Sequence, residues 1–107
     1  MTQGRRLKAL QKRYEVLAAR LSKPGLVLHG TITPRTIISD DPQRPGHKKR
    51  RGPYYQWTRK VKGRTVTVNL SPSQVGHFER AIKNQRRIAQ ILDEMVHISL
   101  KILELTT

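Results

Sequence analysis

The chain has 107 residues, no cysteine, and 22 Lys and Arg against seven Asp and Glu, which leaves a net charge of +15. This length fits one small domain, and the absence of cysteine excludes disulfides and thiolate metal sites. So one-sided a charge opposes folding through self-repulsion and is typical of a protein that binds a polyanion, of which nucleic acid is the usual one.

The first predicted element is a helix over residues 5–23, which Pro24 and Gly25 should end. Its apolar residues recur at intervals of three and four, a narrow seam of heptad type formed by Leu7, Leu10, Tyr14, Leu17 and Leu21. The residues before this seam contain no long apolar run. We therefore expect neither a signal peptide nor a membrane span, and we expect a cytoplasmic location.

Residues 26–38 predict irregular structure with short strands, and a third strand beside the later hairpin is a possibility that Pro34 would confine to an edge. Residues 39–52 predict a flexible basic linker, because prolines and a glycine break regular structure and four consecutive cations repel one another. These cations are Lys48, Lys49, Arg50 and Arg51. We expect the linker to become ordered on a phosphate backbone, where such side chains fix position without reading bases.

Residues 53–70 predict a β-hairpin, since Thr, Val, Tyr and Trp gather on either side of Lys62 and Gly63. A two-residue turn there places Val61 opposite Arg64, with Gly63 at positive φ. Stepping back by pairs, this register puts Tyr55, Trp57, Arg59, Val66, Val68 and Leu70 on one face. The polar side chains of both strands then share the other face, so one register separates apolar from polar residues.

Residues 72–104 predict a long helix, with Ser71 as N-cap, Pro72 at the first helical position and Gln74 completing a capping box. Two apolar stripes run along its second half. One can pack on the first helix, so the other requires a partner, for which we expect a second copy or a larger complex. The residues expected to form this contact are Ile88, Ile91, Met95, Ile98 and Ile102.

The elements together predict an α+β protein that binds nucleic acid. The expected contacts, besides the linker cations, are Tyr54, Arg59, Lys60, Lys62, Arg64, Arg80, Lys83, Arg86 and Arg87. Tyr54 lies on the polar face and is the aromatic residue freest to stack on an unpaired base, whereas Tyr55 and Trp57 should serve the core. With only five aromatic residues, duplex or structured RNA is favoured over a single-strand stacking platform.

Catalysis finds little support in the sequence. Asp40 and Asp41 are more typical of a turn than of a metal site, and the four histidines lack ligand spacing. We expect no enzyme, no metal and no cofactor.

The segment GPYYQWTRKVKGRTVTVNLSPSQ, residues 52–74, resembles a family of small uncharacterised bacterial proteins that are often encoded near transposases and other mobile elements. The resemblance covers the hairpin and the start of the last helix. Members often carry cysteines before the GPYY opening, where this chain has PGHKKRR, so a metal knuckle is excluded here. The resemblance implies an accessory protein of a mobile element and supplies no activity. The alternatives are a structural subunit of a ribonucleoprotein and a module that binds an acidic protein.

Overall fold

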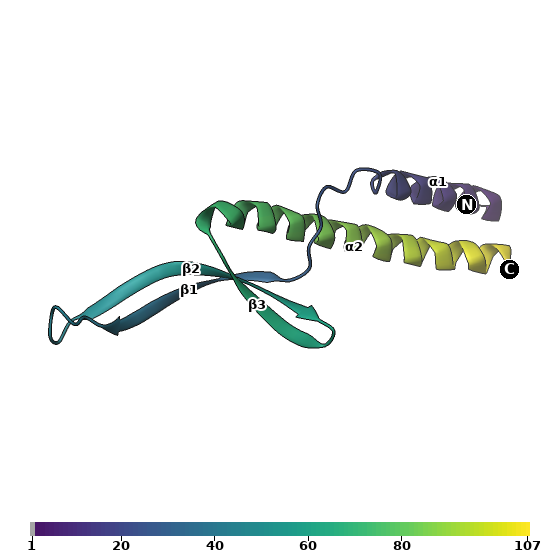
Figure 1. Ribbon diagram of the computed structural model, residues 1–107. Helices are drawn as coiled ribbons and strands as arrows, with labels where there is room; N and C mark the ends of the chain where they lie inside the picture. The colour runs from purple at the N-terminus through teal and green to yellow at the C-terminus, as the bar shows by residue number, and fades with distance from the viewer. Residues whose placement is uncertain (1) are drawn as a thin grey trace. The chain divides into compact units, whose positions relative to one another are not determined.

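The structure is a computed structural model that describes residues 2–107. Its elements, in chain order, are helix α1 (Gln3–Ala19), strands β1 (Thr31–Asp40), β2 (Lys48–Val61) and β3 (Arg64–Leu70), and helix α2 (Pro72–Thr106) (Figure 1). The strands form one antiparallel sheet in the order β1-β2-β3. The predicted α+β class is therefore confirmed.

The chain divides into two compact units. The helical unit contains the described residues up to Val27 together with Lys83–Thr107, and the sheet unit contains Leu28–Ile82. Helix α2 contributes its first turns to the sheet unit and the remainder to the helical unit.

In the helical unit, α1 and the later part of α2 run antiparallel and side by side (Figure 1). Leu17 is fully buried in a cluster with Ile91 and Ile98. The Gln3 side chain donates a hydrogen bond to the Leu105 carbonyl at 2.9 Å, so the start of α1 meets the end of α2.

Helix α1 ends at Ala19 rather than at the predicted residue 23. The next three N–H groups, those of residues 20–22, each bond to a carbonyl three residues earlier, at 3.1–3.2 Å. This tighter pattern satisfies the last carbonyls without continuing the α-helix, so the helix ends before Pro24 is reached.

The prediction that Ile88, Ile91, Met95, Ile98 and Ile102 of α2 contact a partner is wrong in its choice of residues. Ile91 and Ile98 are buried against α1, Met95 and Ile102 pack on the same cluster, and Ile88 is half-buried. The stripe that was assigned to a partner is thus the one that α1 covers. The exposed apolar side chains of this part of α2 belong to the other stripe: Leu92, Val96, Leu100 and Leu103.

In the sheet unit, the β2–β3 hairpin has the predicted register, from Val61 opposite Arg64 to Tyr55 opposite Leu70. Lys62 and Gly63 both adopt positive φ, 50° and 79°, as a two-residue turn of type I′ requires. Trp57, Leu70 and Ile82 form the buried cluster, onto which Phe78 and other partly buried side chains pack. The first turns of α2 therefore cover the Trp57 side of the sheet.

The predicted flexible linker over residues 39–52 is wrong at both ends. Strand β1 extends to Asp40 and β2 begins at Lys48, so that residues 41–47 alone connect the two strands. Asp41 closes this loop, because its N–H bonds to the His47 carbonyl at 3.0 Å and its side chain accepts from the Gln43 N–H at 2.9 Å.

Pairing with β1 explains why the cationic run becomes a strand. Residues 48–51 lie opposite Asp40, Ser39, Ile38 and Ile37 respectively, so none of the cations faces another cation across the ladder. The β-branched residues at positions 36–38 favour the extended conformation of β1. Pro34 lies in β1, which is an edge strand, in agreement with the restriction expected for a proline.

A candidate nucleic-acid interface on a two-stranded arm

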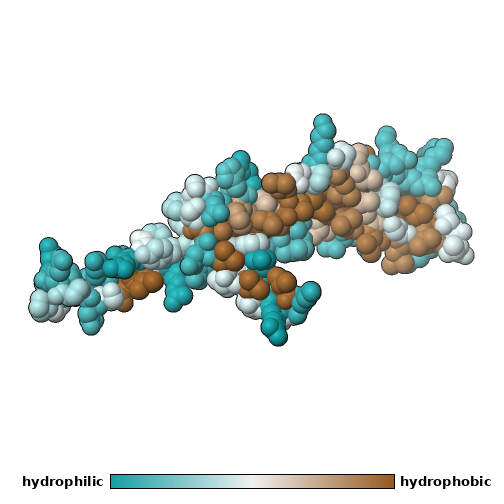
Figure 2. All heavy atoms as spheres, viewed as in Figure 1, coloured by the Kyte–Doolittle hydropathy of each residue, from teal (hydrophilic) through white to brown (hydrophobic). Residues whose placement is uncertain are grey.

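The ribbon formed by β1 and β2 continues beyond the three-stranded part of the sheet (Figure 1). Strand β3 pairs with Tyr55–Val61, whereas residues 35–54 form a hairpin of β1 and β2, here called the basic arm. The arm contains six Lys and Arg against two Asp, and its side chains are exposed except for that of Asp41, which is half-buried. Figure 2 shows this end of the sheet unit as a mostly hydrophilic surface.

A β-bulge decides which way the arm cations point. Arg35 lies opposite Tyr54, but Ile37 lies opposite Arg51, so Gly52 and Pro53 together face the single residue between 35 and 37. One extra residue reverses the alternation of side chains along β2. Lys49 and Arg51 therefore share a face with Tyr54, and Lys48 and Arg50 point to the opposite face.

Gly52 is required at this bulge. Its φ is 110°, a conformation that L side chains rarely adopt, and a Cβ would lie 2.9 Å from both the Arg35 carbonyl oxygen and the Tyr54 nitrogen. The sequence signal for the bulge is the Gly52-Pro53 pair, which was assigned to the linker and the start of the hairpin.

The Tyr54 face carries a hollow of 270 Å³ where the arm joins the three-stranded sheet. The residues that line it are Arg35, Ile37, Tyr54, Gln56 and Asn69. Tyr54 is 45% exposed, and Ile37 is also 45% exposed. The Gln56 side-chain amide donates a hydrogen bond to Asn69 Oδ1 at 3.2 Å, across the β2–β3 ladder. Sequence reasoning placed Tyr54, Gln56 and Asn69 on one face of the hairpin but missed Arg35 and Ile37, because the register of β1 against β2 has no local signal in the sequence.

Lys48 and Arg59 have contacts within the protein. Lys48 forms an ion pair with Asp40, which lies opposite it in the ladder, and both side chains are largely exposed. The guanidinium of Arg59 lies 3.9 Å above the centre of the Trp57 ring, and its Nη1 is buried without a hydrogen-bond partner among the described residues. Arg59 thus covers the core, whereas Lys60, Lys62 and Arg64 are exposed near the hairpin turn.

The helix cations expected to extend the interface fall into both units. Arg80 is exposed in the sheet unit, whereas Lys83, Arg86 and Arg87 belong to the helical unit. Their participation in one continuous surface with the arm stays a prediction.

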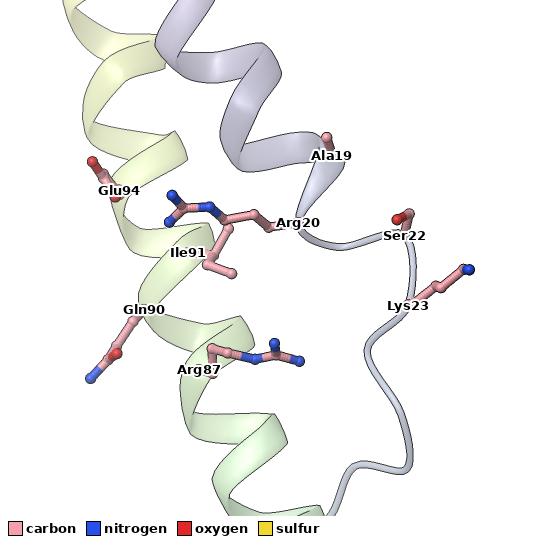
Figure 3. Close-up of a pocket in the computed structure, with 8 residues that line it drawn as sticks. All are labelled: Ala19, Arg20, Ser22, Lys23, Arg87, Gln90, Ile91 and Glu94. Carbon is pink, nitrogen blue, oxygen red and sulfur yellow. The ribbon is translucent and has the colours of Figure 1, made fainter.

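Arg87 borders a second hollow, of 480 Å³, within the helical unit (Figure 3). Arg20 extends from the end of α1 towards α2, and Arg87 extends from α2 towards the loop that follows α1, while Lys23 points away. Arg87 donates a hydrogen bond to the Pro24 carbonyl at 3.4 Å. On the same helix, Glu94 is paired with Arg13 at 2.9 Å. The hollow therefore gathers cations that sequence reasoning had left dispersed.

Within residues 2–107, no group of three or more His, Asp or Glu side chains is arranged to hold a metal ion, and neither helix of this part of the chain is long and apolar enough to cross a membrane. Comparisons with family models, with curated proteins and with solved structures found no match to the chain.

Proposed function

We propose that this chain is a nucleic-acid-binding accessory protein with a binding role and no catalytic one, and that the basic arm is its principal contact. One observation carries the proposal: the arm is a two-stranded ribbon, exposed along its length, whose cations outnumber its acids by six to two. An isolated hairpin is only marginally stable in water, and repulsion among like charges weakens it further. A polyanion laid along the ribbon would remove that repulsion.

The distribution of cations favours a duplex as the ligand. A two-stranded ribbon fits the major groove of B-form DNA, which is about 12 Å wide. Because side chains alternate along β2, Lys49 and Arg51 point to one face and Arg50 to the other, and a ribbon in the groove would present cations to the phosphates of both walls. The narrow major groove of A-form RNA does not admit such a ribbon, so we propose duplex DNA as the preferred form.

The test compares two variants that remove equal charge. The arm variant replaces Lys48, Lys49, Arg50 and Arg51 with Gln, and the control variant replaces Arg5, Arg6, Lys8 and Lys12 of α1 with Gln. Fluorescence anisotropy with a labelled DNA duplex is recorded between about 50 and 200 mM salt.

We expect the arm variant to flatten the dependence of log affinity on log salt by about 0.9 for each phosphate that it no longer neutralises, and by about 3 overall, because Lys48 is already paired with Asp40. The control variant should retain most of the slope. Equal decreases in the two variants would show that net charge, and not the arm, determines binding. Absence of duplex binding at low salt would refute the proposal and leave the alternative of a module that binds an acidic protein. Stronger binding to folded RNA than to DNA would support the ribonucleoprotein alternative.

A further inference from the structure

We propose that the hollow on the Tyr54 face binds one unpaired nucleobase at the junction between the arm and the three-stranded sheet. This inference rests on the proposed function and adds to it a site that recognises a base, whereas the arm cations recognise phosphates. The hollow combines an exposed aromatic ring, a pair of amides and a cation, which are the three kinds of group that proteins use to hold an extruded nucleotide.

Tyr54 supplies the stacking surface. Its side chain is 45% exposed although Tyr55 and Trp57, its neighbours on β2, pack in or against the core. Ile37 is equally exposed on the adjacent strand and forms an apolar wall beside the ring. An exposed aromatic ring next to an apolar wall loses water-exposed surface when a flat base covers it.

Gln56 and Asn69 supply the polar recognition. Their mutual hydrogen bond, 3.2 Å long, uses one amide donor and one acceptor and leaves the Gln56 carbonyl oxygen and the Asn69 NH₂ group for a ligand. If the oxygen and nitrogen positions of both amides were exchanged, the pair would still have one free donor and one free acceptor for a ligand. Adenine presents an adjacent donor and acceptor, its N6 amino group and N7, which side-chain amides bind in a bidentate manner. Because Asn69 is exposed and Gln56 is half-buried, the pair is fixed by the ladder but open to a ligand.

Arg35 and Arg51 are placed to hold the flanking phosphates. Arg35 lines the hollow opposite Tyr54, and the bulge brings Arg51 to the same face, opposite Ile37. Without the extra residue at Gly52-Pro53, Arg51 would point to the other face. The bulge thus places a base-sized hollow beside cations on one surface.

The experiment uses three DNA duplexes of equal sequence, one fully paired, one with a single extra unpaired adenosine and one with an abasic residue at that position. Base–aromatic stacking is worth about 1–3 kcal/mol by alanine substitution, which corresponds to roughly 5- to 150-fold in affinity. We therefore expect the full chain to bind the adenosine duplex at least about fivefold more tightly than the abasic duplex. Placing the fluorescent analogue 2-aminopurine at the extra position should show quenching on binding.

The variants assign the effect to the hollow. Tyr54→Phe should keep the preference for the unpaired base, Tyr54→Ala should abolish it, and the double variant Q56A/N69A should reduce it. The matched control is T58A/T67A, which removes the next cross-strand pair on the same face, a hydroxyl contact of 3.0 Å outside the hollow. Far-UV circular dichroism confirms that each variant is folded.

Equal affinities for the adenosine and abasic duplexes, with the arm cations still required, would overturn the base site and leave the proposed function intact. Equal effects of T58A/T67A and Q56A/N69A would also overturn it, because the weaker binding would then reflect the sheet and not the hollow. Failure of the chain to bind any of the duplexes would instead refute the proposed function itself.

A different observation carries a second inference, in the helical unit: we infer that a second copy of the chain packs on the exposed stripe of α2. A hollow of 390 Å³ lies beside this stripe, and none of the seven described residues that line it is charged. Four of them, Leu92, Val96, Leu100 and Leu103, are 45–69% exposed. Figure 2 shows the helical unit with a broad hydrophobic surface.

The net charge of the chain and the spacing of apolar residues on α2 favour a second copy as the partner. Two copies of a chain with a net charge of +15 can approach closely only where neither presents a cation, and this hollow is such a place. An acidic partner would gain nothing from an uncharged surface. On α2, Ala89, Leu92, Val96, Ser99 and Leu103 repeat at alternating intervals of three and four, the seam by which two helical hairpins combine into a four-helix bundle.

The size of the face sets the expected strength. Helix α1 has 17 residues and is therefore about 25 Å long, and two packed helices are about 18 Å across, which gives a face of about 450 Å² in projection. Standard-size complexes bury about 800 Å² on each partner, so a face of this size is small and we expect a weak dimer that dissociates on dilution.

Sedimentation equilibrium over a range of concentrations tests this inference. The wild-type chain should be a dimer at high concentration, and the double variant L92E/V96E should be a monomer. The control is Val16→Glu, which adds a charge at an apolar residue of α1 that is 42% exposed and lies outside the hollow. A wild-type chain that is monomeric throughout, or a Val16→Glu variant that dissociates equally, would overturn the inference.

Discussion

Trp57→Ala should remove most of the stability of the sheet unit, because this one side chain connects the three parts of its small core. The indole is 9% exposed and meets the Phe78 ring edge-on, with centroids 5.2 Å apart. Its N–H donates to the His29 carbonyl at 2.9 Å, and the guanidinium of Arg59 lies over its face. Truncation therefore removes the packing of the indole on α2, on the segment before β1 and on β2 itself.

The free-energy cost of Trp57→Ala can be compared with the total stability of a small domain. Truncating a buried Trp to Ala costs roughly 3–5 kcal/mol, whereas small domains are stable by about 5–15 kcal/mol in total. The buried cluster contains three residues, Trp57, Leu70 and Ile82, which places the sheet unit near the lower limit. A loss of this size leaves the unit only about 0–2 kcal/mol of stability, so we expect the variant to be partly unfolded at room temperature and to lose its remaining structure at low urea concentration.

The assay is urea unfolding followed by far-UV circular dichroism, since the substitution removes the single tryptophan that fluorescence would report. Trp57→Phe is the control, because it keeps an aromatic ring against Phe78 but leaves the His29 carbonyl without its donor; it should cost about 1–2 kcal/mol. An unchanged urea midpoint for Trp57→Ala would refute the reasoning, since it would mean that the indole contributes no packing to the core.

Three further substitutions test local features of the structure. Gly76→Ala in α2 should stabilise the protein by about 0.5–1 kcal/mol in thermal unfolding, because a Cβ there meets nothing within 4 Å and glycine weakens a helix interior. Gly30→Ala should destabilise it by more than about 2 kcal/mol in the same assay, because φ is +117° and the added Cβ would lie 2.5 Å from a carbonyl oxygen of β2. A double-mutant cycle on Arg13 and Glu94 should give a coupling below about 1 kcal/mol, because both side chains are more than two-fifths exposed, and a larger coupling would contradict that exposure.

The sequence predicts the β2–β3 hairpin in full because its signals are local. A two-residue turn fixes the register, and strict alternation of apolar and polar side chains selects one pairing. The start of α2 is equally local, and one of the two hydrogen bonds of the predicted capping box is formed: the Gln74 side chain accepts the Ser71 N–H at 2.9 Å, whereas the Gln74 N–H bonds to the Ser71 carbonyl.

The arm could not be predicted in this way, because its strand conformation depends on pairing between segments that carry opposite local signals. Residues 48–51 are four cations that repel one another in an isolated chain, yet each faces a neutral or acidic residue once β1 is paired with β2. The bulge at Gly52 then determines the direction of every side chain before it. No pattern in the composition of this run reveals which of its cations share the face of Tyr54.

The apolar surface of α2 shows the same dependence on distant residues. Both stripes of the helix have apolar spacing, so periodicity alone does not distinguish the one that packs on α1. The stripe that packs on α1 is identified by Leu17 of α1, which is fully buried in one cluster with Ile91 and Ile98. The sequence could predict that one stripe requires a partner but not which.

The two proposed sites follow from one physical problem, which is how a chain with this excess of positive charge keeps a folded state at all. Seven hydrophobic side chains of the described residues are buried, and none is in the arm or on the exposed stripe of α2. Each of these surfaces is therefore weakly stabilised by the chain itself, for opposite reasons: the arm has charge without a core, and the stripe has apolar surface without cover. In the two proposals made above, a nucleic acid would offset the charge of the arm and a second copy would cover the apolar surface of the stripe. Because none of the described residues that line the hollow beside the stripe is charged, association there would bring no two cations together within the hollow.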